Sequence, residues 1–444
     1  VKYSAILIFL SVLTASIANN PGLVATIRKP IVEKVRDHYF EDVFNVLGVQ
    51  TMPNFKDGDI GVSSIEVKLA NPSPKNLEVT FKPDNNAIGV IIKNTKVIIH
   101  CNWKYSKLVL SLSGDADISG TINEISLDIP MELTVGDFSL PVIGVQNFAL
   151  NMNKNLFGVK LRCSGCPGAV ESILTSFMKD NLLSKVHDQI INQVPTQIQS
   201  MANRVLLNNY PRTFALYNDI EFATELVQKI IVKEDHLEVK FDGTIYPQDE
   251  GYIRPGPAPE IPTFNEEDPG EIMMFFNSYL TETLSETLNK QVETYSSKLL
   301  GISYTAILDP AISQTIVGFE DGDFVLDMHP KIITNTFKLG VQFNSEIKLK
   351  LKIKNGDKYN MMTITPSIKK WHLNDLKLVV GGIPINIGYV NFITNPLVRL
   401  FLNWFIIPNI YIPKSDILPL TVTNNLLQFH KEYAELGISF DFEN

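Results

Sequence analysis

The sequence predicts an α+β protein of two tandem tubular barrels, in each of which a highly twisted antiparallel sheet wraps around long amphipathic helices. Three observations lead to this prediction. The chain has 444 residues, more than one hydrophobic core usually serves, so two domains are expected. Residues 246–270 contain six prolines and interrupt every periodic pattern, because proline removes an amide donor and disfavours helix in the residue before it. On each side of this stretch, the same elements follow one another: an amphipathic helix, a series of strands and a second apolar helix.

The expected boundaries are a signal peptide over residues 1–18, an N-terminal barrel over 19–243, a proline-rich connector over 244–270 and a C-terminal barrel over 271–444. Lys2, the apolar run after it and the small residues Ser16 and Ala18 are typical of a cleaved signal peptide. The alternative is a membrane anchor, but the run is shorter than the ~20 apolar residues of a spanning helix. We therefore expect a secreted, extracellular protein, or one in the lumen of the secretory pathway.

The charge distribution argues against some partners. Residues 20–215 carry 19 Lys and Arg against 18 Asp and Glu, whereas residues 216–444 carry 19 against 30. Neither half has the strong basic field that nucleic-acid binding requires, so no nucleic-acid partner is expected. An acidic chain also gains little from general attraction to anionic membranes, so any membrane contact must be local.

The first unit begins with a predicted helix over residues 30–47, which starts at Pro30 and stops before Gly48. Its apolar stripe consists of Ile31, Val35, Tyr39, Val43 and Leu47. Residues 61–160 then alternate between apolar and polar or run apolar between turns. Because no helix interrupts these strands, an antiparallel, strongly bent sheet is expected.

A long helix is predicted over residues 167–207, with Pro195 expected to kink it. It would extend roughly 60 Å, so it needs an equally long apolar surface to lie against. Its stripe consists of Val170, Ile173, Leu174, Phe177, Leu182, Val186, Ile190, Val194, Ile198, Met201 and Val205. Residues 236–246 return to strand before the connector.

The second unit repeats this order. A strand over residues 273–276 precedes a helix that Ser278 is expected to cap, with Leu280, Leu284, Leu288, Val292 and Tyr295 on one face. Strands follow over 324–387, and between 347 and 354 every second residue is a lysine. These lysines indicate a solvated outer face that discourages edge pairing, with a lipid-headgroup patch as the alternative. An apolar helix over 389–407 and a strand over 434–442 complete the unit.

The three cysteines, Cys101, Cys163 and Cys166, allow one disulfide and one free thiol in a secreted chain. The spacing of Cys163 and Cys166 is also that of redox and metal motifs, but no second Cys or His pair stands at ligand spacing. A structural bridge from Cys101 to Cys163 or Cys166 is therefore predicted.

Motifs of catalysis are missing from the sequence. The seven histidines show no metal-ligand spacing, and there is no nucleophile elbow, zinc-protease helix or phosphate-binding glycine loop. The segments 57–59 and 320–323 lack the further oxygen ligands of calcium loops and are predicted to be turns. No enzymatic activity, metal or cofactor is therefore expected.

Over essentially its whole length, the chain resembles the bactericidal/permeability-increasing, lipopolysaccharide-binding and plasma lipid-transfer proteins. The residues that carry the resemblance, in this order, are Asn20-Pro21-Gly22, Asn102-Trp103-Lys104, the proline cluster 255–259, Phe275-Phe276-Asn277-Ser278-Tyr279, the segment 406–420 and Gly437 to Asp441. The resemblance implies a boomerang of two lipid-binding barrels, each with one phospholipid-like ligand between its helices and its concave sheet.

The chain departs from this family at two places. The position that matches the helical cysteine of the family's disulfide is His187, so that bridge is expected to be absent or replaced. Lipopolysaccharide binders of the family have a strongly basic N-terminal tip, whereas acidic residues here offset Arg28, Lys29, Lys34 and Arg36. This departure weakens the expectation of endotoxin neutralisation.

The sequence thus predicts a secreted, monomeric, non-enzymatic protein that takes acyl chains of phospholipid or lipopolysaccharide into two apolar pockets. Its expected role is innate defence or lipid transfer, with transient contact to a membrane or lipid-particle surface. The predicted lipid-binding residues are Ile31, Val35, Val43, Phe177, Val186 and Ile190 in the first unit and Leu284, Leu288, Leu397, Phe401 and Trp404 in the second. Ordinary core packing is the alternative for each residue. A structural or adhesive protein with closed cores, or a lipid hydrolase, is the alternative for the chain.

Overall fold

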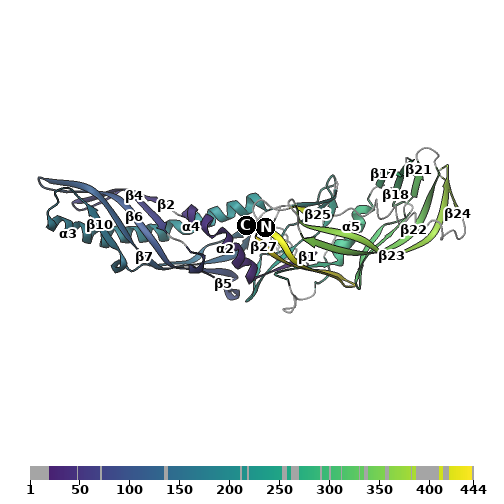
Figure 1. Cartoon of the computed structure of the whole chain (residues 1–444), viewed down its shortest axis with the longest axis horizontal. Helices are drawn as coiled ribbons and strands as arrows, with labels where there is room; N and C mark the ends of the chain where they lie inside the picture. The colour runs from purple at the N-terminus through teal and green to yellow at the C-terminus, as the bar shows by residue number, and fades with distance from the viewer. Residues whose placement is uncertain are drawn as a thin grey trace, which may run out of the picture.

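The computed structural model describes residues 20–442 except 48, 71–72, 135–138, 211–212, 218–219, 253–257, 262–269, 291–292, 300–301, 312, 330, 335–338, 356–359, 382, 387–409 and 414–419. The molecule is elongated, and its two termini lie near its middle (Figure 1). It consists mostly of β-sheet, and every strand pair in the described residues is antiparallel. In the N-terminal half a long helix lies along a curled half-barrel sheet (Figure 1), so the chain has an α+β fold.

The N-terminal half contains a nine-stranded sheet whose main order is β10-β7-β6-β4-β2. Its longest strands, β6 and β7, form one hairpin from the pair Lys107 and Leu110 to the pair Ala87 and Pro130. The strands are β2 Val49–Met52, β3 Phe55–Asp57, β4 Ile60–Ala70, β5 Leu77–Lys82, β6 Ala87–Lys107, β7 Leu110–Leu133, β8 Pro141–Ile143, β9 Gln146–Asn151 and β10 Gly158–Arg162. Short 3-10 helices cover Pro74–Asn76, Pro83–Asn85 and Lys154–Leu156.

The predicted long helix is confirmed and consists of α3 (Gly168–Phe177), a π-helical turn η4 (Met178–Leu182) and α4 (Leu183–Asn209). Pro195 lies inside α4. The π turn was not predicted, although the apolar stripe steps by five residues from Phe177 to Leu182, which is the step of such a turn. In this turn the carbonyl of Asp180 accepts hydrogen bonds from Lys154 and from the Ser184 hydroxyl.

The two halves share a six-stranded sheet at the centre of the molecule, in the order β13-β14-β1-β16-β27-β26. Strand β1 (Leu23–Arg28) pairs with β14 (His236–Phe241) on one side and β16 (Ile272–Asn277) on the other. The remaining strands are β13 Ile231–Val232, β26 Leu420–Phe429 and β27 Tyr433–Phe442. The predicted helix over 30–47 follows β1 directly as α2 (Lys29–Leu47). A separate three-stranded sheet comprises β11 Thr213–Tyr217, β12 Ile220–Ala223 and β15 Ile245–Pro247.

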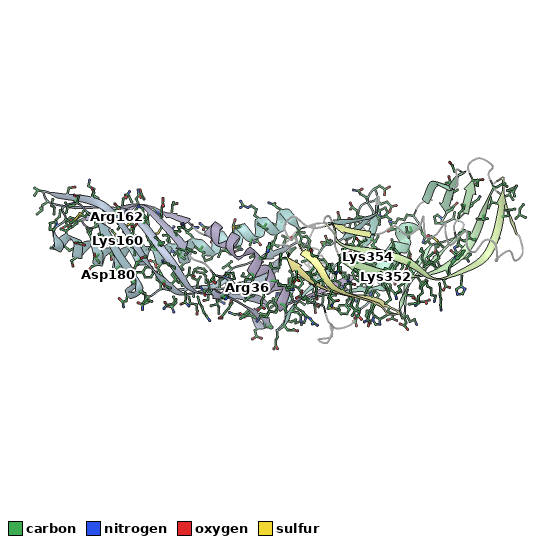
Figure 2. The ribbon with its side chains drawn as sticks, viewed as in Figure 1. Arg36, Lys160, Arg162, Asp180, Lys352 and Lys354 are labelled. Carbon is green, nitrogen blue, oxygen red and sulfur yellow. A yellow bond between two sulfur atoms is a disulfide. The ribbon has the colours of Figure 1, made fainter. Side chains whose placement is uncertain are left out.

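The second nine-stranded sheet lies in the C-terminal half. Its strands are β17 Glu293–Leu299, β18 Ile302–Leu308, β19 Ile316–Glu320, β20 Asp323–Met328, β21 Lys331–Thr334, β22 Leu339–Asn355, β23 Asn360–Val380, β24 Ile383–Asn386 and β25 Ile410–Pro413. As predicted, Lys350, Lys352 and Lys354 of β22 are exposed while Ile347 and Leu349 are buried. Lys348 is half-buried and pairs with Glu320. Lys352 and Lys354 lie toward the middle of the molecule (Figure 2).

The helix of the second unit, α5 (Ser278–Leu288), is shorter than predicted. Its cap is Asn277 rather than Ser278, because the Asn277 side chain accepts a hydrogen bond from the Tyr279 amide. The helix stops at Asn289, whose side chain bonds to both backbone groups of Thr315. Tyr295, predicted on the helix face, belongs to strand β17, where an aromatic residue is favoured. The predicted helix over 389–407 lies outside the described residues.

The predicted disulfide partner was wrong. Cys163 and Cys166 are bonded to each other, with their Cα atoms 5.7 Å apart, and Cys101 is a free, fully buried thiol. The Cys163–Cys166 bond closes a tight turn in which Gly165 has a φ of +77°, a conformation that favours glycine. Burial, with nearby Asp117 and Asp115, raises the pKa of Cys101 to about 12, so this thiol is unreactive in the folded protein.

Candidate functional site

The end of the N-terminal half that holds α3 is a filled hydrophobic core. Leu174, Met178 and Leu182 are completely buried there against the inner face of the sheet, which contributes Ile99 and Trp103. Interiors of this kind are packed as densely as organic crystals and leave no room for an acyl chain. A ligand must therefore bind elsewhere along the helix.

Burial decreases along α4 although its apolar stripe continues. Val186 is fully buried, whereas the next apolar residues of the helix are only half-buried: Ile190, Ile191, Val194, Ile198 and Met201. At this point a small cleft opens between α4 and strands β2 and β4. We call it the α4 groove, and it is lined by Gln50, Thr51, Met52, Val67, Gln189, Ile190, Gln193 and Val194. Its floor is apolar and its rim carries glutamine side chains, but its volume of ≈ 10 Å³ holds about one water molecule. An acyl chain could therefore enter only if α4 moved away from the sheet.

The predicted lipid-binding residues of the first half lie in three different places. Ile190 lines the α4 groove, and Val186 lies in the filled core beside it. Phe177 is in the same core, where its ring stacks on Phe55 with centroids 6.2 Å apart. Ile31 belongs to another cluster, formed with β27 residues such as Leu436. Val35 is half-buried on α2, and the side chain of Val43 lies outside the described residues.

In the second half, Leu284 and Leu288 are half-buried and pack against a small core around Phe343 and Ile347. Leu397, Phe401 and Trp404 lie outside the described residues. Contact of these residues with lipid stays a prediction.

The opposite face of α5 is buried and polar, which the sequence reasoning missed. Thr283 and Thr287 bond to the two backbone groups of Ile245 at 3.1 and 3.0 Å, and the Tyr279 hydroxyl lies 2.8 Å from that of Thr244. The spacing of Tyr279, Thr283 and Thr287, four residues apart, was the signal that could have revealed this face. These bonds fix α5 to strand β15 and turn Leu284 and Leu288 toward the sheet of the second half.

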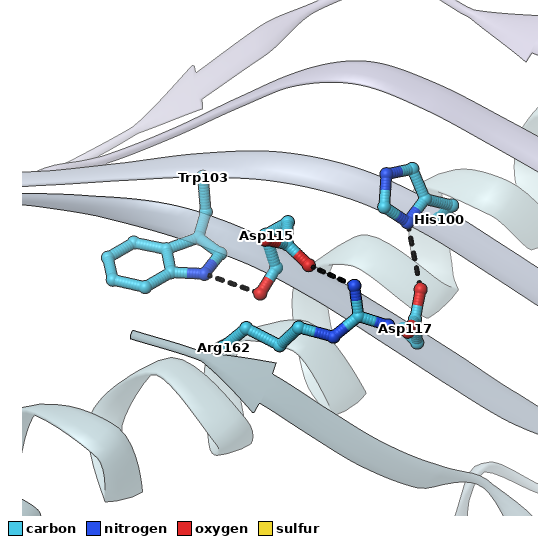
Figure 3. A network of polar contacts seen from close by, with 5 residues as sticks. All are labelled: His100, Trp103, Asp115, Asp117 and Arg162. Atoms are coloured by element: carbon cyan, nitrogen blue, oxygen red, sulfur yellow. Dashed lines mark hydrogen bonds and ion pairs between the residues drawn. The ribbon is translucent and has the colours of Figure 1, made fainter. Parts of the chain in front are cut away.

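The outer face of the N-terminal sheet carries a charged network across β6, β7 and β10 (Figure 3). Asp117 bonds to His100 Nδ1 at 2.8 Å and to Arg162, which also pairs with Asp115 at 3.0 Å. The hydrogen bond from His100, together with the charges of Arg162 and Lys160, lowers the pKa of Asp117. Among the described residues no cluster of His, Cys, Asp and Glu could hold a metal ion. Because the network joins three strands through opposite charges, it stabilises the sheet.

This network makes the stability of the fold depend on pH. Because the pKa of Asp117 is lower in the folded state, the unfolded state takes up the proton first as the pH falls. The contribution of Asp117 is thus complete above about pH 5 and is lost as the pH falls through the lowered pKa, below about 3.9. We expect urea denaturation to show a stability gap between the wild type and Asp117→Asn that narrows over this range. Asp84→Asn, which alters an exposed carboxylate, is the control, and its stability should equal that of the wild type over this pH range. A stability difference for Asp117→Asn that is constant with pH would contradict the lowered pKa of Asp117.

Comparison with known proteins shows what this arrangement resembles. No protein-family model and no curated protein sequence matches the chain. The crystal structure of lipopolysaccharide binding protein matches 96% of this chain and 100% of its own, with a TM-score of 0.53 and 15% sequence identity. The chain has the fold of lipopolysaccharide-binding protein. Because this likeness extends over both halves, the resemblance predicted from the sequence is confirmed at the level of the fold.

A second structure, Takeout 1 of Epiphyas postvittana, matches 37% of this chain and 77% of its own, with 13% identity and a TM-score of 0.22. No described helix is long and apolar enough to cross a bilayer.

Proposed function

We propose that this protein is a secreted, non-enzymatic lipid-binding protein. In this proposal an acyl chain of a phospholipid, or of lipid A in lipopolysaccharide, enters the α4 groove, and a second groove lies between α5 and the C-terminal sheet. The corresponding units are residues 19–243 and 271–444, joined by the connector over 244–270, and the protein acts as a monomer that touches membranes or lipid particles transiently. Its biological role is innate defence or lipid transfer.

The observation that carries the proposal is the decrease in burial along the single apolar stripe of α4. Half-buried apolar residues facing a sheet gain free energy if an acyl chain covers them. A chain of about 16 carbons gains ~12 kcal/mol relative to water, at ~0.8 kcal/mol per methylene, but almost nothing relative to a bilayer. Such a groove would exchange lipid with membranes without an energy source.

The charges near α2 argue against the strongly basic site that lipopolysaccharide binders of the family carry. Lys34 pairs with Glu271 and Asp441 at 2.8 and 3.0 Å, and Arg36 pairs with Asp37 at 2.7 Å. Both cations are therefore engaged within the chain. Recognition of the phosphates of lipid A would require cations that are free to pair with them.

Native mass spectrometry of the secreted protein, purified without detergent, tests the proposal. We expect adducts of phospholipid mass at up to two per chain, because two grooves are proposed. A bare chain that also takes up no labelled lipid from vesicles would support the alternative of a structural or adhesive protein with closed cores.

A further inference from the structure

A disulfide lies in an exposed turn between strand β10 and helix α3. Strand β10 ends at Arg162, and the bonded cysteines Cys163 and Cys166 follow with only Ser164 and Gly165 between them. Ser164 and Gly165 are exposed, and both cysteines are half-buried. A Cβ atom added to Gly165 would meet no other atom within 4 Å. A thiol from solvent can therefore approach the bond without moving the chain.

This bond contributes little to the stability of the fold. A disulfide stabilises a protein mainly by closing a loop in the unfolded chain, and this effect grows with the number of residues in the loop. Cys163 and Cys166 are only three residues apart, and their bond joins neither two strands nor the two halves of the molecule. The turn can also form without the bond, because Gly165 adopts its φ of +77° without strain. A role in chemistry is therefore favoured over a role in stability.

The start of helix α3 lies directly after Cys166. Pro167 is the N-cap, and its carbonyl oxygen accepts hydrogen bonds from the amides of Val170 and Glu171. The partial positive charge at the start of a helix stabilises a thiolate there, and reactive Cys-x-x-Cys pairs use this effect. The carboxylate of Glu171, in the first turn, opposes the effect in part. Because Cys166 is closer to the helix than Cys163, its thiolate gains more.

The remaining charges near the pair do not alter this asymmetry. Arg162 precedes Cys163, but its guanidinium group is already paired with Asp115 and Asp117 on the neighbouring strand. It therefore adds little positive charge at Cys163. The order of strand, Cys-x-x-Cys segment and helix thus leaves Cys166 as the better leaving group of the two, since the more acidic thiol leaves faster in disulfide exchange.

We propose that Cys163 and Cys166 form a reversible redox pair that accepts two electrons from external thiols. An external thiolate attacks the sulfur of Cys163 and forms a mixed disulfide with it, while Cys166 leaves as a thiolate. A second external thiolate then attacks the external sulfur of the mixed disulfide, and Cys163 leaves as a thiolate. The two external thiols become one disulfide, and their two protons pass to the reduced pair. The redox pair is independent of the proposed lipid binding, because it lies outside the α4 groove.

Alkylation of the folded, full-length protein tests the redox pair. The wild type is incubated with reduced glutathione or with reduced thioredoxin, then treated with iodoacetamide, and the modified cysteines are identified by mass spectrometry. We expect Cys163 and Cys166 to be alkylated and Cys101 to stay unmodified until urea is added, because Cys101 is free but fully buried. Cys101 thus reports within the same sample that the protein remains folded. Reaction with glutathione alone would identify small thiols as the electron source, and reaction with thioredoxin alone would identify protein dithiols.

Two outcomes of this experiment would overturn the proposal. If neither thiol reduces the pair until urea unfolds the chain, the disulfide is an inert structural bridge. If all three cysteines are alkylated without urea, the bond holds the fold together, which contradicts its exchange in the native state.

Single substitutions test the order of attack. Cys163→Ser leaves the thiol of Cys166, and Cys166→Ser leaves that of Cys163. At pH 7 we expect iodoacetamide to react about 10-fold faster with Cys166 than with Cys163, because a thiol with a pKa lower by about one unit has about ten times more thiolate. The melting temperatures of both variants should lie within about 4 °C of that of the wild type. Equal reaction rates would overturn the assignment of Cys166 as the leaving thiolate.

Discussion

Replacing Ile190 and Val194 with aspartate is expected to reduce lipid occupancy of the first half by about 100-fold. Both side chains line the α4 groove and are only half-buried, so water can still reach the new carboxylates and the fold should tolerate them. An acyl chain in the groove would displace that water and desolvate two charges, which is strongly unfavourable. Native mass spectrometry should therefore show the loss of one lipid adduct, with little change in the melting temperature.

The matched control adds the same two charges on the other side of the helix. Asn192 and Thr196 are exposed on α4, so Asn192→Asp with Thr196→Asp should leave lipid occupancy as it is in the wild type. If the groove variant keeps its full lipid load, the α4 groove is not the site. If both variants lose lipid, the net charge of the helix is responsible rather than the groove.

Replacing Leu174 with alanine should lower the free energy of unfolding by about 3 to 5 kcal/mol, because it leaves a cavity in a filled core. Leu174 is 0% exposed, and its neighbour Ile173, also assigned to the apolar stripe from the sequence, is 49% exposed. Ile173→Ala should therefore change the free energy of unfolding by less than about 1 kcal/mol. Urea denaturation of the two variants measures the contrast, and similar values would contradict the filled core at this end of the molecule.

Periodicity predicted the elements that lie on one continuous surface. The long helix of residues 167–207 and the lysine-bearing strand β22 were recognisable because their apolar residues repeat at 3.6 and 2 residues. The same reasoning placed the end of α5 too late, because the apolar residues of the sequence repeat at helical spacing as far as Val292 and Tyr295. Only the tertiary contact of Asn289 with Thr315 shows where the helix stops.

The candidate site was harder to predict than the elements around it. The sequence placed Val186 and Ile190 on one stripe, but whether each residue is buried by the sheet or left half-covered depends on the distance between helix and sheet along their length. No local pattern contains this distance. Ile31 was also predicted to bind lipid because it lies on an apolar helix stripe. In the structure it packs on β27, which follows some 400 residues later in the chain. The predicted cysteine pairing was wrong because the short-range bond between Cys163 and Cys166 competes with any bridge to the buried Cys101.

The position of β1 in the central sheet has a consequence for biosynthesis. Leu23 pairs with Phe241 on one side and with Phe276 on the other, and β16 pairs in turn with β27. A ribosome would therefore release β1 long before any of its neighbours exist, and both of its edges would stay unpaired during most of translation. Such late closure is slow, and open strand edges are prone to aggregate. The nascent chain is thus expected to depend on chaperones until its final strands emerge.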